Sequence, residues 1–198
     1  MIDCTTSEPA STEKDATELR SRGIRFVDAP LTRTSRDADT GRLNVLIGGS
    51  EDDVVAAKPV LKYFAENTFH IGTVGTAHKM KLINNFLTIG CAAVVIEAVS
   101  AARSLAVDTK ALFEVVSVGG ANSGAFQMIM PWVNDCETKF PFSVARAAKD
   151  IGYYLAATET GAMAGALSQT LRGAIEKNLQ DVYLPALTDH SGKLGTKP

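Results

Sequence analysis

The segment from about residue 77 to 106 constrains the fold most, because it is long, rich in apolar residues and free of proline. Gly90 is its only weak point as a helix. At 1.5 Å per residue it predicts one helix of roughly 45 Å. Further helical patterns follow, separated by glycine and proline, at about 108–118, 121–134, 143–160 and 162–181. The second region of the chain is therefore predicted to be all-α.

The first 76 residues have a different character, because short apolar runs alternate with amphipathic segments. The pattern predicts helices at 10–22 and about 50–66, and strands at 24–29, 43–47 and 69–71. Such alternation is typical of α/β proteins. We therefore predict an α/β region at 1–76, an all-helical domain at 77–187 and a flexible polar tail at 188–198.

Composition narrows the classes of function. The net charge is −2, from 20 basic and 22 acidic residues, so electrostatics favours neither nucleic acid nor an anionic membrane as a partner. The apolar run at 86–99 is shorter than the roughly 20 residues of a membrane span. Three widely spaced cysteines without a CxxC pair indicate reduced thiols in a cytoplasmic protein, and no metal site is predicted.

A polar stripe crosses the predicted long helix. Lys81, Asn84, Asn85 and Thr88 stand at positions i, i+3, i+4 and i+7, so they share one face. Their neighbours are mostly apolar, and a helix that is apolar nearly all round is usually buried. Buried polar groups need partners, because each unsatisfied one costs about 1–3 kcal/mol. The stripe is therefore either a polar network that ties the helix to the first domain or the edge of an active site.

Lys81 has the position expected of a proton-transfer group. It lies in the first two turns of the helix, where the positive end of the helix dipole disfavours a second positive charge. Burial lowers the pKa of a lysine further, and such a lysine can act as general acid and base. Asn85, one turn later, can orient a substrate hydroxyl without competing for the proton.

With these residues in view, the chain resembles the β-hydroxyacid dehydrogenase family. Four segments match in order and span nearly the whole chain: Asp3–Pro9 (D-x-S-T-x-x-P), Phe26–Gly49 (DAPVSGG…VGG), Gly72–Asn85 (G-x-x-G…K-x-x-N-N) and Lys149-Asp150 (K-D). Each match alone is weak, since Lys-Asp is commonly an exposed charged pair and Thr5-Thr6 can simply cap a helix. Four matches in register are a much stronger signal.

The resemblance implies a Rossmann-type domain, a helical domain like the C-terminal domain of 6-phosphogluconate dehydrogenase, and a homodimer or homotetramer built around the long helix. It implies NAD or NADP as the cofactor and a small hydroxyacid or semialdehyde as the substrate. In this family pattern Lys81 is the catalytic proton donor and acceptor, and Asn85 holds the substrate oxygen. Lys149 approaches the nicotinamide, and Thr6 touches the cofactor.

One loop departs from the usual family pattern. Thr32-Arg33-Thr34-Ser35 stands where most members have S-G-G, and it resembles the G-R-T-S loop of the sulfolactaldehyde reductase branch. An arginine between two hydroxyls suits a carboxylate, sulfonate or phosphate. In that branch the positions of Asn84 and Thr88 also help to bind the sulfonate. The alternative is that Arg33 is a solvated loop residue beside nearby aspartates.

The family's G-x-G-x-x-G fingerprint, which seats the pyrophosphate, does not occur in the sequence. The first strands of a Rossmann domain are expected to be missing with it. The sequence thus supports two hypotheses. The chain is an NAD(P)-dependent dehydrogenase of a small β-hydroxyacid or hydroxy-sulfonate, or it is a truncated, non-catalytic dimerisation module derived from this family.

Overall fold

The computed structural model describes residues 1–159 and 161–190, so most of the predicted tail at 188–198 lies outside the described residues. The chain forms two compact units. The first consists of residues 1–85 and 153–159, and the second of 86–152 with the described residues from 161 onward. The predicted boundary near residue 76 remains a prediction.

The first unit is built on a five-stranded mixed sheet. The strand β4 (Leu43–Gly48) is central, with β5 (Ala65–Gly72) parallel to it on one side. On its other side β2 (Val27–Asp28) and β3 (Leu31–Thr32) both run antiparallel to it. The strand β1 (Ile2–Asp3) pairs in parallel with β2. The predicted α/β character of this region is thereby confirmed.

Three helices accompany this sheet, namely α1 (Pro9–Ser21), the short α2 (Ser35–Asp39) and α3 (Glu51–Leu61). The helix α3 buries Val54, Ala57 and Leu61 in one cluster with Val27, Val45 and Ile47 of the sheet and with Ala29, which follows β2. Ser50 caps α3 by accepting a hydrogen bond from the main-chain N–H of Asp53 at 3.3 Å. The cluster is the core of this unit because it joins both strand directions to one helix.

Several predicted bounds change for local reasons. The strand expected at 24–29 is reduced to β2, and Pro30, which has no N–H to donate, separates it from β3. The segment between the strands expected at 24–29 and 43–47 contains α2, because Thr34 and Asp37 form a capping box. The strand expected at 69–71 is the eight-residue β5. The preceding helix ends early, at Leu61, two residues after its internal Pro59.

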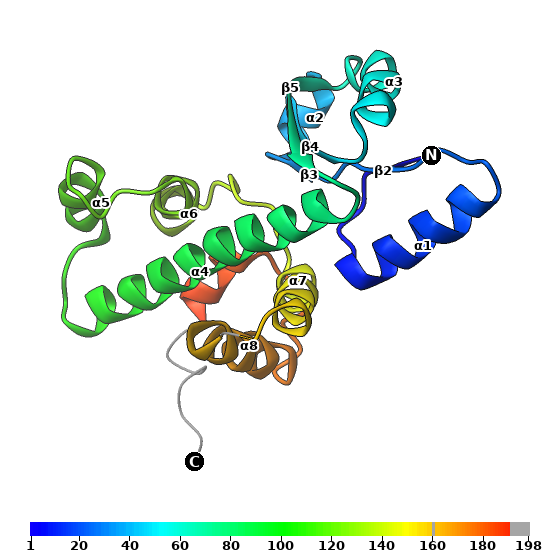
Figure 1. Cartoon of the computed structure of the whole chain (residues 1–198). Coiled ribbons are helices and arrows are strands. Elements are labelled where there is room, and N and C mark those ends of the chain that lie inside the picture. The colour runs from blue at the N-terminus through cyan, green and yellow to red at the C-terminus, as the bar shows by residue number, and fades with distance from the viewer. Residues whose placement is uncertain (160, 191–198) are drawn as a thin grey trace. The chain divides into compact units, whose positions relative to one another are not determined.

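The long helix α4 (Thr76–Ser104) runs unbroken through Gly90 and is the longest ribbon in Figure 1. Its buried positions follow a repeat of four and three residues, at His78, Leu82, Asn85, Ile89, Ala92, Ile96 and Val99. This spacing defines one face that packs against the rest of the chain. The residues up to Asn85 belong to the first unit and those from Phe86 to the second.

A helix buried all round was expected here, and that expectation is wrong for the chain by itself. Leu87 is 60% exposed and Val94 is 62% exposed, because the chain covers only one face of α4. By length and composition α4 is also long and apolar enough to cross a membrane, since an 18-residue stretch of it has a mean hydropathy of 1.8. Core helices of soluble proteins share this length and composition.

The second unit is all-helical, as predicted. After α4 it contains α5 (Thr109–Ser117), α6 (Gly124–Asp135), α7 (Val144–Ala157, whose last turn belongs to the first unit), α8 (Ala162–Ile175) and the 3-10 helix η1 (Leu184–Asp189). The helix expected at 162–181 ends at Ile175, and η1 follows it (Figure 1). Arg103 on α4 donates to the carbonyl of Thr188 and so fixes η1.

One glycine in the first unit is required by a neighbouring side chain. A Cβ atom at Gly48 would lie 2.4 Å from Oδ1 of the buried Asp28. We expect Gly48→Ala to lower the free energy of unfolding by about 1–3 kcal/mol, because the added carbon overpacks a full site. Gly120→Ala is the control, since a Cβ there meets nothing within 4 Å. Equal unfolding free energies for the two variants in urea denaturation would contradict this account.

Candidate functional site

The turn from β5 into α4 directly precedes the helix that carries the predicted catalytic residues. Gly72 and Gly75 both have positive φ angles, of 153° and 89°, which lets the chain reverse direction sharply before the helix begins. Thr76 then donates its hydroxyl to the carbonyl of Thr73 at 2.6 Å. A hydrogen bond between two of its own residues thus stabilises the turn in part. The turn sets where α4 starts and thus where Lys81 lies.

The stripe residues of the first unit differ in burial. Asn85 is 6% exposed, although its side chain is an amide, and lies on the buried face of α4. Lys81 and Asn84 are half-buried beside it. The Nδ2 atom of Asn84 donates to Oδ1 of Asn85 at 3.4 Å. The helix thus presents an ammonium group and two amides at the margin of its packed face.

A buried aspartate that the sequence interpretation left without a role holds the start of this helix. Asp28 on β2 is fully buried, and its carboxylate accepts hydrogen bonds from the N–H groups of Gly75 at 2.8 Å and His78 at 3.0 Å. His78 is also fully buried. An acid inside an otherwise apolar strand was the signal that could have revealed Asp28, because a buried carboxylate needs such partners.

The predicted anion loop lies between β3 and α2. Thr32 is paired in β3 with Asn44, and Thr34 is the N-cap of α2. Arg33 adopts a φ angle of 80°, which is uncommon for a residue other than glycine. Its guanidinium donates to the carbonyl of Arg42 at 2.6 Å and forms an ion pair with Glu66 on β5. In this state Glu66 provides the carboxylate that Arg33 binds.

The hydroxyl of Thr34 is also engaged within the loop. It donates to Asp37 at 2.7 Å, and the main-chain N–H of Thr34 donates to the same carboxylate oxygen at 3.1 Å. These two hydrogen bonds, with the charge of Arg42 as a smaller contribution, hold the pKa of Asp37 below its usual value. The loop is therefore preorganised by its own residues around the positive φ of Arg33.

The remaining predicted residues are spread over both units. Thr6 follows the carboxyl end of β1, the edge where ligands of α/β sheets bind. Thr88 and Lys149 belong to the second unit and are placed only within it. Lys149 on α7 forms an ion pair of 3.2 Å with the buried Asp150, so the Lys-Asp pair is more than two solvated charges.

The fit of a dinucleotide to the described residues is partial. The turn between β1 and α1 contains no glycine, and α1 begins with Glu8 as its N-cap and Pro9 in its first turn. A negative side chain there disfavours a pyrophosphate. Within residues 1–159 and 161–190, no turn has the G-x-G-x-x-G spacing that seats a pyrophosphate, and Thr6 and Lys149 belong to different units.

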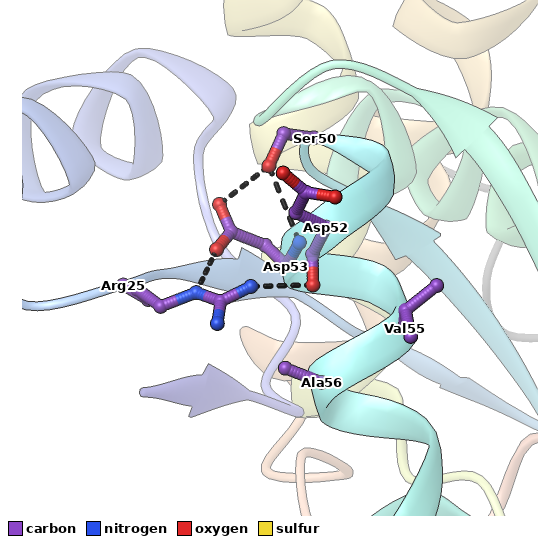
Figure 2. Close-up of a pocket in the computed structure, with 6 residues that line it drawn as sticks. All are labelled: Arg25, Ser50, Asp52, Asp53, Val55 and Ala56. Carbon is purple, nitrogen blue, oxygen red and sulfur yellow. Dashed lines mark hydrogen bonds and ion pairs between the residues drawn. The ribbon is translucent and has the colours of Figure 1, made fainter.

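Two other kinds of site carry less weight. Within the described ranges, no group of three histidine, cysteine, aspartate or glutamate side chains could hold a metal ion. A surface hollow of about 480 Å³ lies at the start of α3, shown in Figure 2. There Arg25 bridges the Asp53 carboxylate and the main-chain oxygen of Asp52. Its charge is satisfied inside the protein, so the hollow is structural.

The second unit contains a large apolar groove of about 710 Å³ along α4. Leu87 and Val94 of α4 line it together with Met163 and Leu167 of α8 and Leu187 of η1. The helix α5 of the same unit has no buried residue at all, and its Val115 is 71% exposed. This unit therefore exposes apolar side chains both in the groove along α4 and on α5.

Comparisons with known proteins give a consistent result. Residues 1–72 match the family model of the NAD binding domain of 6-phosphogluconate dehydrogenase. Residues 75–191 match the model of the NAD-binding domain of NADP-dependent 3-hydroxyisobutyrate dehydrogenase. The two models together account for nearly all of the chain.

Individual relatives agree with these models. The chain is 31% identical over 156 residues to 3-sulfolactaldehyde reductase of Escherichia coli, covering 78% of this chain and 52% of that protein. It is 28% identical over 200 residues to 3-hydroxyisobutyrate dehydrogenase of Pseudomonas aeruginosa, covering 97% and 65%. The chain thus spans about half to two thirds of the length of these relatives.

Solved structures show the same fold. The structure of 3-hydroxyisobutyrate dehydrogenase of Mycobacterium tuberculosis with L-serine superposes with a TM-score of 0.86 at 23% identity, covering 96% of this chain and 69% of that chain. A 3-hydroxyisobutyrate dehydrogenase of Salmonella typhimurium gives 0.85 at 22% identity, covering 96% and 68%. This chain therefore has the fold of a Rossmann-type domain followed by a helical domain.

Proposed function

Because this chain belongs to the β-hydroxyacid dehydrogenase family, whose cofactor is NAD or NADP, we propose that it interconverts a small β-hydroxyacid, or hydroxy-sulfonate, and its semialdehyde. The observation that carries the proposal is the pair Lys81 and Asn85 at the start of α4. Asn85 is a buried amide one turn after a half-buried lysine, on a helix start that is held by hydrogen bonds. The proposed compartment is the cytoplasm.

Proton transfer is the proposed role of Lys81. A bound reduced nicotinamide, which Thr6 and Lys149 are proposed to face, would supply the hydride that reduces the carbonyl carbon of the semialdehyde. The C=O π bond then breaks, and the carbonyl oxygen takes a proton from Nζ of Lys81. Asn85 donates a hydrogen bond from its side-chain amide to the same oxygen and orients it. In the oxidative direction Lys81 accepts the hydroxyl proton instead.

Holding the acid group is the proposed role of the loop between β3 and α2. Arg33 is preset by its unusual backbone and already binds a carboxylate, that of Glu66. A substrate carboxylate or sulfonate offers the same chemistry and exchanges with Glu66 at the guanidinium. Thr32, Thr34, Asn84 and Thr88 complete the proposed substrate set. Thr6 and Lys149 are proposed to face the cofactor.

A second candidate function rests on the apolar surfaces of the second unit. The groove of about 710 Å³ and the unburied helix α5 expose apolar surface that a second copy of the chain would cover. Apolar patches of this kind on α4 commonly mark protein interfaces. We propose that the chain forms a homodimer, or a tetramer of such dimers, through them. By this second candidate alone, the chain is a non-catalytic dimerisation module.

Two measurements on the purified chain separate the enzyme from the dimerisation module. Nicotinamide fluorescence during titration with NADH and NADPH measures nucleotide binding, and light scattering measures the oligomeric state. If the chain is an enzyme, we expect it to bind NADH or NADPH with a Kd of about 1 μM to 1 mM, the usual range of enzyme KM values. A chain that is dimeric but binds neither nucleotide at millimolar concentration is the dimerisation module. A monomer at all concentrations would contradict the proposed interface.

Replacement of Lys81 tests the catalytic assignment. We expect Lys81→Ala to lower kcat for semialdehyde reduction by about 10²–10⁴-fold, the usual contribution of a general acid. Lys58→Ala, on α3, is the matched control because it removes the same charge from an exposed position of a helix without proposed site residues. The measurement is the steady-state rate of NADH oxidation. Near-normal turnover by Lys81→Ala would remove Lys81 from the mechanism.

Replacement of the two partners in the anion loop tests substrate binding. We expect Arg33→Ala to raise KM for the anionic substrate by about 10–100-fold, because a charge-assisted hydrogen bond is lost. Glu66→Gln removes the competing carboxylate and should lower KM by about two- to fivefold, as for a partly exposed ion pair. Steady-state kinetics with a carboxylate and a sulfonate semialdehyde measures both. A higher KM in Glu66→Gln would contradict the exchange.

A further inference from the structure

The start of α4 is capped from another element of the fold. The first N–H groups of a helix have no partner within the helix, and a neighbouring side chain commonly accepts them. In α3, α5 and α6 a residue directly before the helix does so, namely Ser50, Asp108 and Ser123. In α4 the acceptor is Asp28, which precedes Gly75 by 47 residues and His78 by 50.

This arrangement connects the register of α4 to the sheet. Both carboxylate oxygens are used, one by Gly75 at 2.8 Å and one by His78 at 3.0 Å. A slip of the helix start by one residue would break both hydrogen bonds and turn every α4 side chain by about 100°. The carboxylate itself has no room to move towards β4, because it fills the space that a Cβ at Gly48 would occupy.

The ring of His78 provides a second attachment. Its Nε2 donates to the carbonyl of Thr5 at 3.1 Å, since a carbonyl can only accept. Its Nδ1 shares a hydrogen bond of 2.7 Å with the hydroxyl of Thr12 on α1. The first turn of α4 is therefore held to β2 through its main chain and to α1 and the turn before it through a side chain. All of these groups belong to the first unit.

We propose that Asp28, acting with His78, is a positioning residue for the reaction proposed above, on which this inference rests. Lys81 follows His78 by three residues and Asn85 follows it by seven. The fixed first turn of α4 therefore sets the directions in which both side chains leave the helix. A displacement of about 1 Å in a catalytic group commonly costs a large factor in rate. The capping of α4 from β2 thus gives Lys81 and Asn85 a place relative to the sheet, which a local cap would not provide.

The test compares Asp28→Asn with two controls. The amide keeps the shape of the side chain but turns one acceptor into a donor that faces an N–H group. Asp108→Asn removes the carboxylate that caps α5 by accepting from Lys110 and Ala111 at 3.0 and 2.9 Å. Leu61→Ala destabilises the same unit through its core, away from α4. All variants are assayed well below their Tm, where each is folded.

Two readouts separate positioning from stability. The first is kcat against KM for semialdehyde reduction by the full chain with NADH. The second is the rate at which an acetylating reagent modifies Lys81, relative to the exposed Lys58 in the same molecule, measured by peptide mass spectrometry. We expect Asp28→Asn to lower kcat by about 10–100-fold with KM changed less than about threefold. The relative acetylation rate of Lys81 should change at least about threefold, and the two controls should leave both readouts unchanged.

The outcomes are decisive in each case. Unchanged kcat and unchanged Lys81 acetylation in folded Asp28→Asn would overturn the inference, as would equal changes in Leu61→Ala. A parent chain without reductase activity counts against the proposed function only, because the acetylation comparison still decides the positioning role. If Asp28→Asn does not fold, Thr12→Val removes the hydroxyl that binds His78. At least a twofold change in Lys81 acetylation there supports the inference, and no change overturns it.

Discussion

The hydrogen bonds between the buried Asp28 carboxylate and the first turn of α4 are the interaction on which the rest of the site depends. A buried carboxylate is costly unless its oxygens are satisfied, and the first N–H groups of a helix are costly unless they find acceptors. The two requirements are met together, because the Asp28 carboxylate accepts the N–H groups of Gly75 and His78. This arrangement leaves room only for glycine at position 48, because a Cβ there would clash with the Asp28 carboxylate. It also positions the start of the helix that carries Lys81 and Asn85.

The sequence was sufficient to predict the architecture, because the spacing of apolar residues and the positions of glycine and proline are local properties of the chain. The proline-free apolar segment predicted α4 to within two residues, and the alternation before it predicted an α/β region. It was insufficient for α2, where the pattern was polar and only the Thr34–Asp37 capping box stabilises a turn of helix. It was also insufficient for the exposed face of α4, since periodicity reports an apolar face but not what covers it.

The residues of the candidate site were predictable from the sequence, but the contacts between residues far apart in the chain were not. Helical spacing placed Lys81 and Asn85 on one helix, and the residues themselves suggested their chemistry. That Arg33 would hold Glu66, thirty-three residues away, follows from the pairing of β4 with β5 and cannot be read from local pattern. Asp28 was recognisable only as a position in a motif, because its partners are 47 and 50 residues distant.

The long helix α4 also belongs to both compact units, since their division falls between Asn85 and Phe86 inside it. Helix formation is cooperative, so loss of packing along one half weakens the hydrogen-bond ladder of the other. For this reason we expect the two units not to unfold independently. The shared backbone segment couples the unfolding of the α/β region to that of the helical region, although each has its own apolar core.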